Sequence, residues 1–109
     1  MKSRAYSPYA QEAVKLLGQL IQLERKQRRW SEKELADRAG IARATLQRIE
    51  KGEMTPKIGL VFEVASLMGV TLFANDKTPL SNNIDRMDDK IALLPKRIRK
   101  NNSVIDDDF

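Results

Sequence analysis

The residues best suited to molecular recognition lie in a short segment that begins near residue 42. Arg43, Ala44 and Gln47 are spaced so that they share the outward face of a helix, while Leu46 and Ile49 point inward. Arginine can donate two parallel hydrogen bonds to guanine, glutamine can pair in the same way with adenine, and alanine can touch a thymine methyl group. This set of side chains therefore predicts a surface that reads base edges in the major groove of DNA.

Residues 31–52 have the pattern of two short helices joined by a tight turn, which would position that surface. Ser31 is a favourable N-cap for the first helix. Gly40 and Gly52 end the two helices, because glycine readily takes the left-handed conformation that closes a helix. The second helix is expected from about residue 42 to residue 51. A helical hairpin with a solvated polar face has the same pattern, so the pattern alone leaves both interpretations open.

The order of short motifs in this region resembles that of a known family. The segments E-L-A-x-x-A-G-I, A-T-L-Q-R-I-E-K-G and V-A-S-L-M-G-V, with a proline between the last two, are similar to those of the Cro/repressor-type (Xre) helix-turn-helix family. The resemblance covers about residues 13–70. It implies an all-α, lambda-repressor-like helix-turn-helix bundle of four to five helices, in which the third helix reads DNA.

The same resemblance assigns roles to individual residues by their motif positions. It implies that Arg43, Ala44 and Gln47 face the bases. The other candidate DNA contacts are Thr45 and Arg48 near the backbone, with Lys26, Arg28, Glu32 and Lys51. The sequence departs from the family at two positions. Glu32 stands where the family usually has a glutamine that contacts phosphate, and Ala42 stands where it often has a capping serine or threonine.

The composition favours a polyanionic partner and argues against catalysis. The chain of 109 residues carries a net charge of +5, all of which comes from residues 1–79, while residues 80–109 are neutral overall. It has neither cysteine nor histidine, which removes disulfides, thiol metal sites and the commonest general base. The acidic residues are expected on exposed faces or in the tail. We therefore expect no enzyme activity, no cofactor and no metal site.

No stretch is apolar enough to span a membrane, and the N-terminus does not have the pattern of a signal peptide. These features predict a cytoplasmic, nucleoid-associated protein.

A first helix is expected from the cap Ser7 and the following Pro8 to about Arg29. Its apolar residues form two stripes, a width that suggests either an ordinary core helix or burial against a second subunit. The stripes are Val14, Leu17 and Ile21, and Leu16, Leu20 and Leu23. The cations near its end, Arg25, Lys26, Arg28 and Arg29, suit either the helix dipole or phosphate contacts. Trp30 is expected in the core.

After Gly52, Thr55 is expected to cap a mostly apolar helix that starts at Pro56 or Lys57 and ends at Leu67 or Met68. This single helix replaces the fourth and fifth helices that the resemblance implies. The β-branched and aromatic segment Val70–Ala74 predicts a short strand. Since the chain offers no second strand, the simplest partner is the same strand of another copy, which makes the protein a homodimer on a palindromic operator.

The sequence changes character at residue 80, which predicts a DNA-binding and dimerisation domain over 1–79 and a flexible tail over 80–109. Ile84, Met87 and Ile91 are spaced to line one face of a short helix that ends before Pro95. The tail has too few apolar residues to fold stably alone, so it is expected to be mobile or to depend on a partner. It ends in K-R-I-R-K and D-D-D-F clusters.

The segment 70–109 resembles HipB-type antitoxins, which partner HipA-type kinase toxins. The favoured hypothesis is therefore a repressor of its own operon that also binds such a toxin. A stand-alone repressor, in which the tail is a solubilising segment or a DNA arm, and a module that does not bind DNA remain alternatives. The identity of the neighbouring gene would distinguish them most cheaply.

Overall fold

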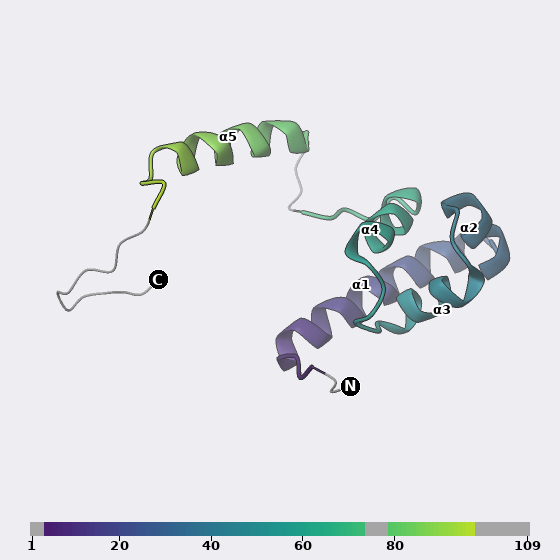
Figure 1. The fold of residues 1–109 in the computed structure, drawn as a ribbon. Coiled ribbons are helices and arrows are strands. Elements are labelled where there is room, and N and C mark those ends of the chain that lie inside the picture. Colours follow the sequence, from purple (N-terminus) through teal and green to yellow (C-terminus); the bar gives the residue numbers. More distant parts are fainter. Residues whose placement is uncertain (1–3, 74–78, 98–109) are drawn as a thin grey trace. The chain divides into compact units, whose positions relative to one another are not determined.

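The computed structural model describes residues 4–73 and 79–97, and five α-helices account for most of them (Figure 1). The helices are α1 (Pro8–Gln27), α2 (Glu32–Ala39), α3 (Arg43–Lys51), α4 (Ile58–Leu67) and α5 (Leu80–Ala92). The chain divides into two compact units, residues 1–75 with α1 to α4 and residues 76–109 with α5. No strand occurs among the described residues. The predicted all-α helix-turn-helix bundle is confirmed.

The first helix begins as predicted and ends two residues early. The Ser7 hydroxyl accepts a hydrogen bond from the Ala10 N–H at 3.2 Å, and Pro8 occupies the first helical position. Arg29 takes a left-handed conformation with φ of 61°, which turns the chain out of the helix. The Trp30 N–H then donates to the carbonyl of Arg25 at 3.1 Å. Arg29 therefore performs the helix-ending role that glycine usually has.

The predicted cap of the fourth helix is wrong. The N-cap of α4 is Lys57 rather than Thr55, and no side chain caps the helix. The extended Lys57 backbone puts the first helical residue at Ile58, beyond the reach of a Thr55 cap. As expected, α4 is the single helix between Gly52 and Gly69.

The core of the first unit joins all four of its helices. Its fully buried apolar residues are Ile21 from α1, Leu35 and Ala36 from α2, Leu46 and Ile49 from α3, and Val64, Ala65 and Met68 from α4 and its end. Trp30 packs against this cluster, as expected, and Arg38 lies over its ring with 4.2 Å between the guanidinium carbon and the ring centroid. Burial of these side chains fixes the four helices to one another.

The backbones of α1 and α3 approach each other closely at Gly18. Gly18 is buried at their crossing, where an added Cβ would meet the Ile49 carbonyl oxygen and come within 2.8 Å of the Glu50 carbonyl oxygen. Both atoms belong to the backbone of α3, so neither can move aside as a side chain would. The crossing of α1 and α3 therefore requires glycine at this position.

A buried ion pair lies beside the same crossing. The Arg25 guanidinium donates to both carboxylate oxygens of Glu50, from Nε at 2.7 Å and from Nη2 at 2.9 Å. Its Nη1 donates to the Trp30 carbonyl at 2.9 Å. The hydrogen bonds to Glu50 raise the pKa of Arg25. The expectation that acidic residues lie only on exposed faces or in the tail is wrong for Glu50, because it follows Leu46 by four residues and faces inward with it.

Replacing Glu50 with glutamine should lower the free energy of unfolding by about 3–5 kcal/mol, since it leaves the Arg25 charge buried without its counter-charge. Urea denaturation followed by circular dichroism measures this loss. The control is the double variant Arg25→Met, Glu50→Leu, which should recover most of the stability because it removes both charges together. A Glu50→Gln protein as stable as the native one would contradict this account.

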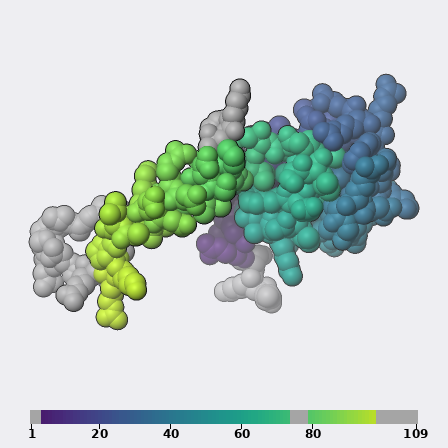
Figure 2. All heavy atoms as spheres, turned by 90° about the horizontal axis from the view of Figure 1, so that it is seen from above, coloured from purple at the N-terminus to yellow at the C-terminus, as the bar shows by residue number. Residues whose placement is uncertain are grey.

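The predicted strand lies just after α4, and the predicted tail helix lies in the second unit. Val70–Phe73 form neither helix nor strand in the single chain, and Ala74 lies outside the described residues. The helix predicted around Ile84, Met87 and Ile91 is confirmed as α5, and no residue of it is buried. Figure 2 draws the atoms of α5 and the described residues after it in green to yellow. The K-R-I-R-K cluster is described only up to Arg97, and the D-D-D-F terminus lies outside the described residues.

Candidate nucleic-acid interface

The helix-turn-helix geometry arises from local capping. The Ser31 hydroxyl accepts from the Glu34 N–H at 3.0 Å, which starts α2 as predicted. Gly40 ends α2 with φ of 71°, and the Ile41 N–H donates back to the Ala36 carbonyl at 3.0 Å. The chain then enters α3 within two residues. This tight turn fixes the direction of α3 relative to α2.

The outward face of α3 carries the predicted base-facing residues. Arg43 and Ala44 are exposed, Gln47 is partly exposed, and all three lie in the first two turns of the helix. Ala42 is the N-cap and supplies no side-chain hydrogen bond, as the sequence implied. The structure therefore brings these three residues together at the end of α3 that follows the turn.

Glu32 lies at the start of α2 and reaches across to this face. Its Oε1 accepts hydrogen bonds from Gln47 Nε2 at 2.9 Å and from Arg43 Nε at 3.1 Å. These two bonds, with that from Gln47 the larger contribution, lower the pKa of the Glu32 carboxyl group. A carboxylate thus stands beside two of the three predicted base readers, where the family usually has an uncharged glutamine.

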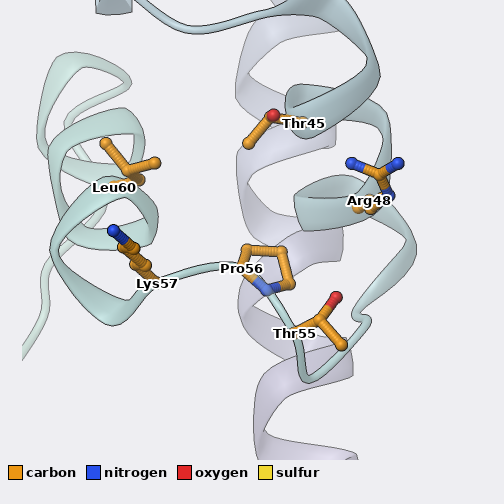
Figure 3. Close-up of a pocket in the computed structure, with 6 residues that line it drawn as sticks. All are labelled: Thr45, Arg48, Thr55, Pro56, Lys57 and Leu60. Carbon is orange, nitrogen blue, oxygen red and sulfur yellow. The ribbon is translucent and has the colours of Figure 1, made fainter.

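A pocket of about 340 Å³ lies beside the same helix, between α3 and the start of α4 (Figure 3). It is lined by Thr45 and Arg48 of α3, by Thr55 and Pro56 of the connecting loop, and by Lys57 and Leu60. The first N–H groups of α4 have no side-chain cap, and they carry the positive end of the helix dipole. The lining includes two cations, Arg48 and Lys57, and two hydroxyl groups, those of Thr45 and Thr55, which are side chains that commonly bind anions.

Thr55 and Lys57 line this pocket and were not singled out from the sequence. The sequence did contain one signal, because a lysine directly before an apolar helix opposes the helix dipole, and a bound anion would offset that opposition. That signal is weak without the loop geometry, which brings Lys57 to the same pocket as Arg48.

The remaining candidates lie in different surroundings. Lys26 and Lys51 are exposed. Arg28 donates from Nη1 to the Leu67 carbonyl at 3.3 Å and from Nη2 to the Met68 carbonyl at 3.2 Å, so it neutralises the carbonyl end of α4. Of the four cations at the end of α1, Arg25 and Arg28 therefore have structural partners.

Within the described part of the chain, no group of acidic residues is arranged to hold a metal ion. None of the described helices has the length and apolar character needed to cross a membrane.

Comparison with known proteins agrees with this geometry. The sequence profile of a family described as "Helix-turn-helix" matches residues 21–74. The matched segment runs from the second half of α1 past the end of α4, so it contains both helices of the helix-turn-helix and is similar in sequence to that family. No curated protein matches the chain.

Several solved structures share the fold. One is titled "HipB-O4 20mer complex" and another "Structure of HipA-HipB-O2-O3 complex", each with 23% sequence identity and a TM-score of 0.50. A third, "MDT Protein", has the same identity and TM-score. In all three comparisons the match covers 71% of this chain and 100% of the other. At this identity the likeness establishes the arrangement of the helices.

Replacing Gln47 with alanine should raise the pKa of Glu32 towards its ordinary value, because it removes the larger of the two stabilising hydrogen bonds. Since the folded-state pKa is lowered, the contact stabilises the native state at neutral pH and is lost as the pH falls through that pKa. Carboxyl carbon NMR titration of Glu32 in both proteins measures the shift. An unchanged pKa in the variant would show that the hydrogen bond does not form in solution.

Proposed function

We propose that this protein is a sequence-specific DNA-binding repressor in which α3 enters the major groove. The observation that supports this most strongly is the joint exposure of Arg43, Ala44 and Gln47 on the first two turns of α3. Their chemistry matches guanine, thymine and adenine edges, respectively. In helix-turn-helix proteins, residues near the start of the second helix of the motif contact the bases.

Phosphate contacts on both sides of the groove would fix this orientation. The pocket formed by Thr45, Arg48, Thr55 and Lys57 at the N-terminus of α4 supports a contact with one backbone phosphate. The exposed cations Lys26 and Lys51 are proposed as further phosphate contacts. Arg28 is assigned to the carbonyl end of α4 instead, because both of its Nη groups already donate there.

We also propose that the protein acts as a homodimer on a palindromic operator. The exposed apolar residues on α1 support a second subunit, since Leu16, Leu20 and Leu23 are each at least 39% exposed. Pairing of the Val70–Ala74 segments of two copies would add main-chain hydrogen bonds to that contact. A two-fold dimer would place its recognition helices about 34 Å apart, one turn of DNA.

The more specific proposal is an antitoxin that binds a HipA-type kinase through its tail. The feature that supports it is α5, whose apolar residues Leu80, Ile84, Met87 and Ile91 share one side of the helix and are each at least half exposed. An isolated helix of 13 residues is marginal in water, so this side favours a partner. The fold neighbour whose title names HipA with HipB supports the same choice. A lone repressor is the alternative.

Arg43→Ala should weaken binding to the operator by about 1–3 kcal/mol and relax the preference at one base pair. Lys57→Ala should weaken binding to all duplexes equally. It should also reduce the slope of the logarithm of the binding constant against the logarithm of the salt concentration by about one unit, because one phosphate contact is lost. Fluorescence anisotropy at several salt concentrations, with the operator and a scrambled duplex, measures both effects. Lys57→Ala is the control for loss of a positive charge without loss of a base contact, and Arg43→Ala is the control for loss of a base contact. Equal losses on both duplexes for Arg43→Ala would contradict the proposed position of α3.

Deleting residues 80–109 should leave operator affinity within a few-fold of the native value and abolish binding to the proposed HipA-type kinase partner. The basis is that the first unit contains its own core and every proposed DNA contact, while the apolar side of α5 is the proposed anchor. Ile84→Ser with Ile91→Ser in the full chain is the matched control and should show the same loss of kinase binding. Loss of operator binding with no effect on a protein partner would favour the lone repressor with a DNA arm.

A further inference from the structure

The double contact made by Glu32 carries an inference about which bases this domain prefers. One carboxylate oxygen, Oε1, accepts from both Arg43 and Gln47, which stand four residues apart on α3. The Arg43 side chain is 63% exposed, so it would otherwise be free to take many rotamers. The contact with Glu32 limits that freedom before any DNA arrives.

The hydrogen-bonding chemistry of the Glu32 carboxylate sets the orientation of the Gln47 side-chain amide. An ionised carboxylate accepts hydrogen bonds and cannot donate them, so Gln47 must turn its NH₂ group towards Glu32. The amide retains one N–H and its carbonyl oxygen for another partner. One donor beside one acceptor is the arrangement that pairs with the N7 and N6 groups of adenine. A neutral glutamine at residue 32 would permit either orientation of the Gln47 amide, because it can donate as well as accept.

The same carboxylate selects one edge of the Arg43 guanidinium. Its Nε donates to Glu32, which leaves the two Nη groups at the end of the side chain without that partner. Two parallel N–H donors at the end of an arginine match the O6 and N7 acceptors of guanine. Adenine presents a donor at the corresponding position and is a poor match for this fork.

The negative charge of Glu32 also favours specific over non-specific binding. Glu32 is paired with Arg43 at 3.1 Å, so the base-reading end of α3 carries less net positive charge than its side chains alone suggest. Sequence-independent attraction to phosphate depends on that positive charge. A carboxylate at this position therefore lowers the affinity for unrelated DNA, while the Nη groups of Arg43 and the remaining N–H and carbonyl oxygen of Gln47 stay available to contact bases.

From this geometry we infer that Glu32 is a positioning residue that sets the base preference of α3: it holds Arg43 for guanine and Gln47 for adenine. Glu32 thus acts through the two side chains that touch the bases. This inference rests on the proposed function, since it requires α3 to lie in the major groove.

The test is selection of binding sites from a randomised duplex by the native full-length protein, followed by single-base-pair substitutions in the selected site. The native protein should select a guanine whose preference is lost in Arg43→Ala and an adenine whose preference is lost in Gln47→Ala. Glu32→Gln, which keeps the size of the side chain, should reduce discrimination at both positions by at least about fivefold. It should also increase affinity for a scrambled duplex, because one negative charge is removed.

Double variants separate positioning from a general structural effect. In the Gln47→Ala background, Glu32→Gln should no longer change discrimination at the adenine position, and in the Arg43→Ala background it should no longer change discrimination at the guanine position. Thermal unfolding of each variant shows whether the domain remains folded. A merely structural role would lower affinity at all positions in every background, and that result would overturn the inference.

Failure of this inference is distinguishable from failure of the proposed function. If the native protein selects no sequence at all, the proposed repressor function fails. If it selects a site but Glu32→Gln retains both preferences within about twofold, the function stands and the role of Glu32 is overturned. A selected site that lacks guanine and adenine at the positions governed by Arg43 and Gln47 has the same consequence.

Discussion

The buried pair between Arg25 and Glu50 is the interaction on which the arrangement of α3 depends. It joins the end of α1 to the end of α3, and the third hydrogen bond of Arg25, to the Trp30 carbonyl, holds the chain where it turns towards α2. A bidentate pair has a narrow range of favourable geometries. The direction of α3 is therefore set by a polar contact as well as by apolar packing, and the close approach at Gly18 leaves little room for the two helices to shift.

Most of the fold is local in origin, which is why it could be predicted from the sequence. Ser7 and Ser31 start helices through their own hydroxyl groups, and Gly40 and Gly52 end them through their own conformations. The apolar spacing of α3 correctly predicted that Leu46 and Ile49 are buried and that Arg43 and Ala44 are exposed. Features that depend on distant contacts were missed or wrong. Glu50 was expected at the surface; its spacing from Leu46 puts it on the buried face of α3, and its charge is balanced there by Arg25, which lies 25 residues earlier.

The candidate site likewise contains some residues that the sequence motif predicted and others that only the folded structure brings together. The family-like motif pointed to Arg43, Ala44 and Gln47, and the structure places them together on α3. It also pointed to Glu32, but the departure from the usual glutamine did not reveal that the carboxylate would accept hydrogen bonds from both Arg43 and Gln47. Thr55 and Lys57 joined the site only through the path of the loop between α3 and α4. The role of Arg28 as a phosphate contact stays a prediction, and the folded chain adds a feature that the sequence did not reveal, its hydrogen bonds to the carbonyls that end α4.

The distribution of helix caps in the first unit has a consequence for how folding and binding are coupled. Serine hydroxyl groups cap α1 and α2, whereas α3 and α4, the two helices that would approach the duplex, begin at Ala42 and Lys57 without a side-chain cap. A missing cap costs about 0.5–2 kcal/mol. A phosphate oxygen bound at the start of α4 would supply an acceptor that the sequence itself omits. The operator would then act as a structural component of the domain, completing a helix that the free chain leaves without a cap.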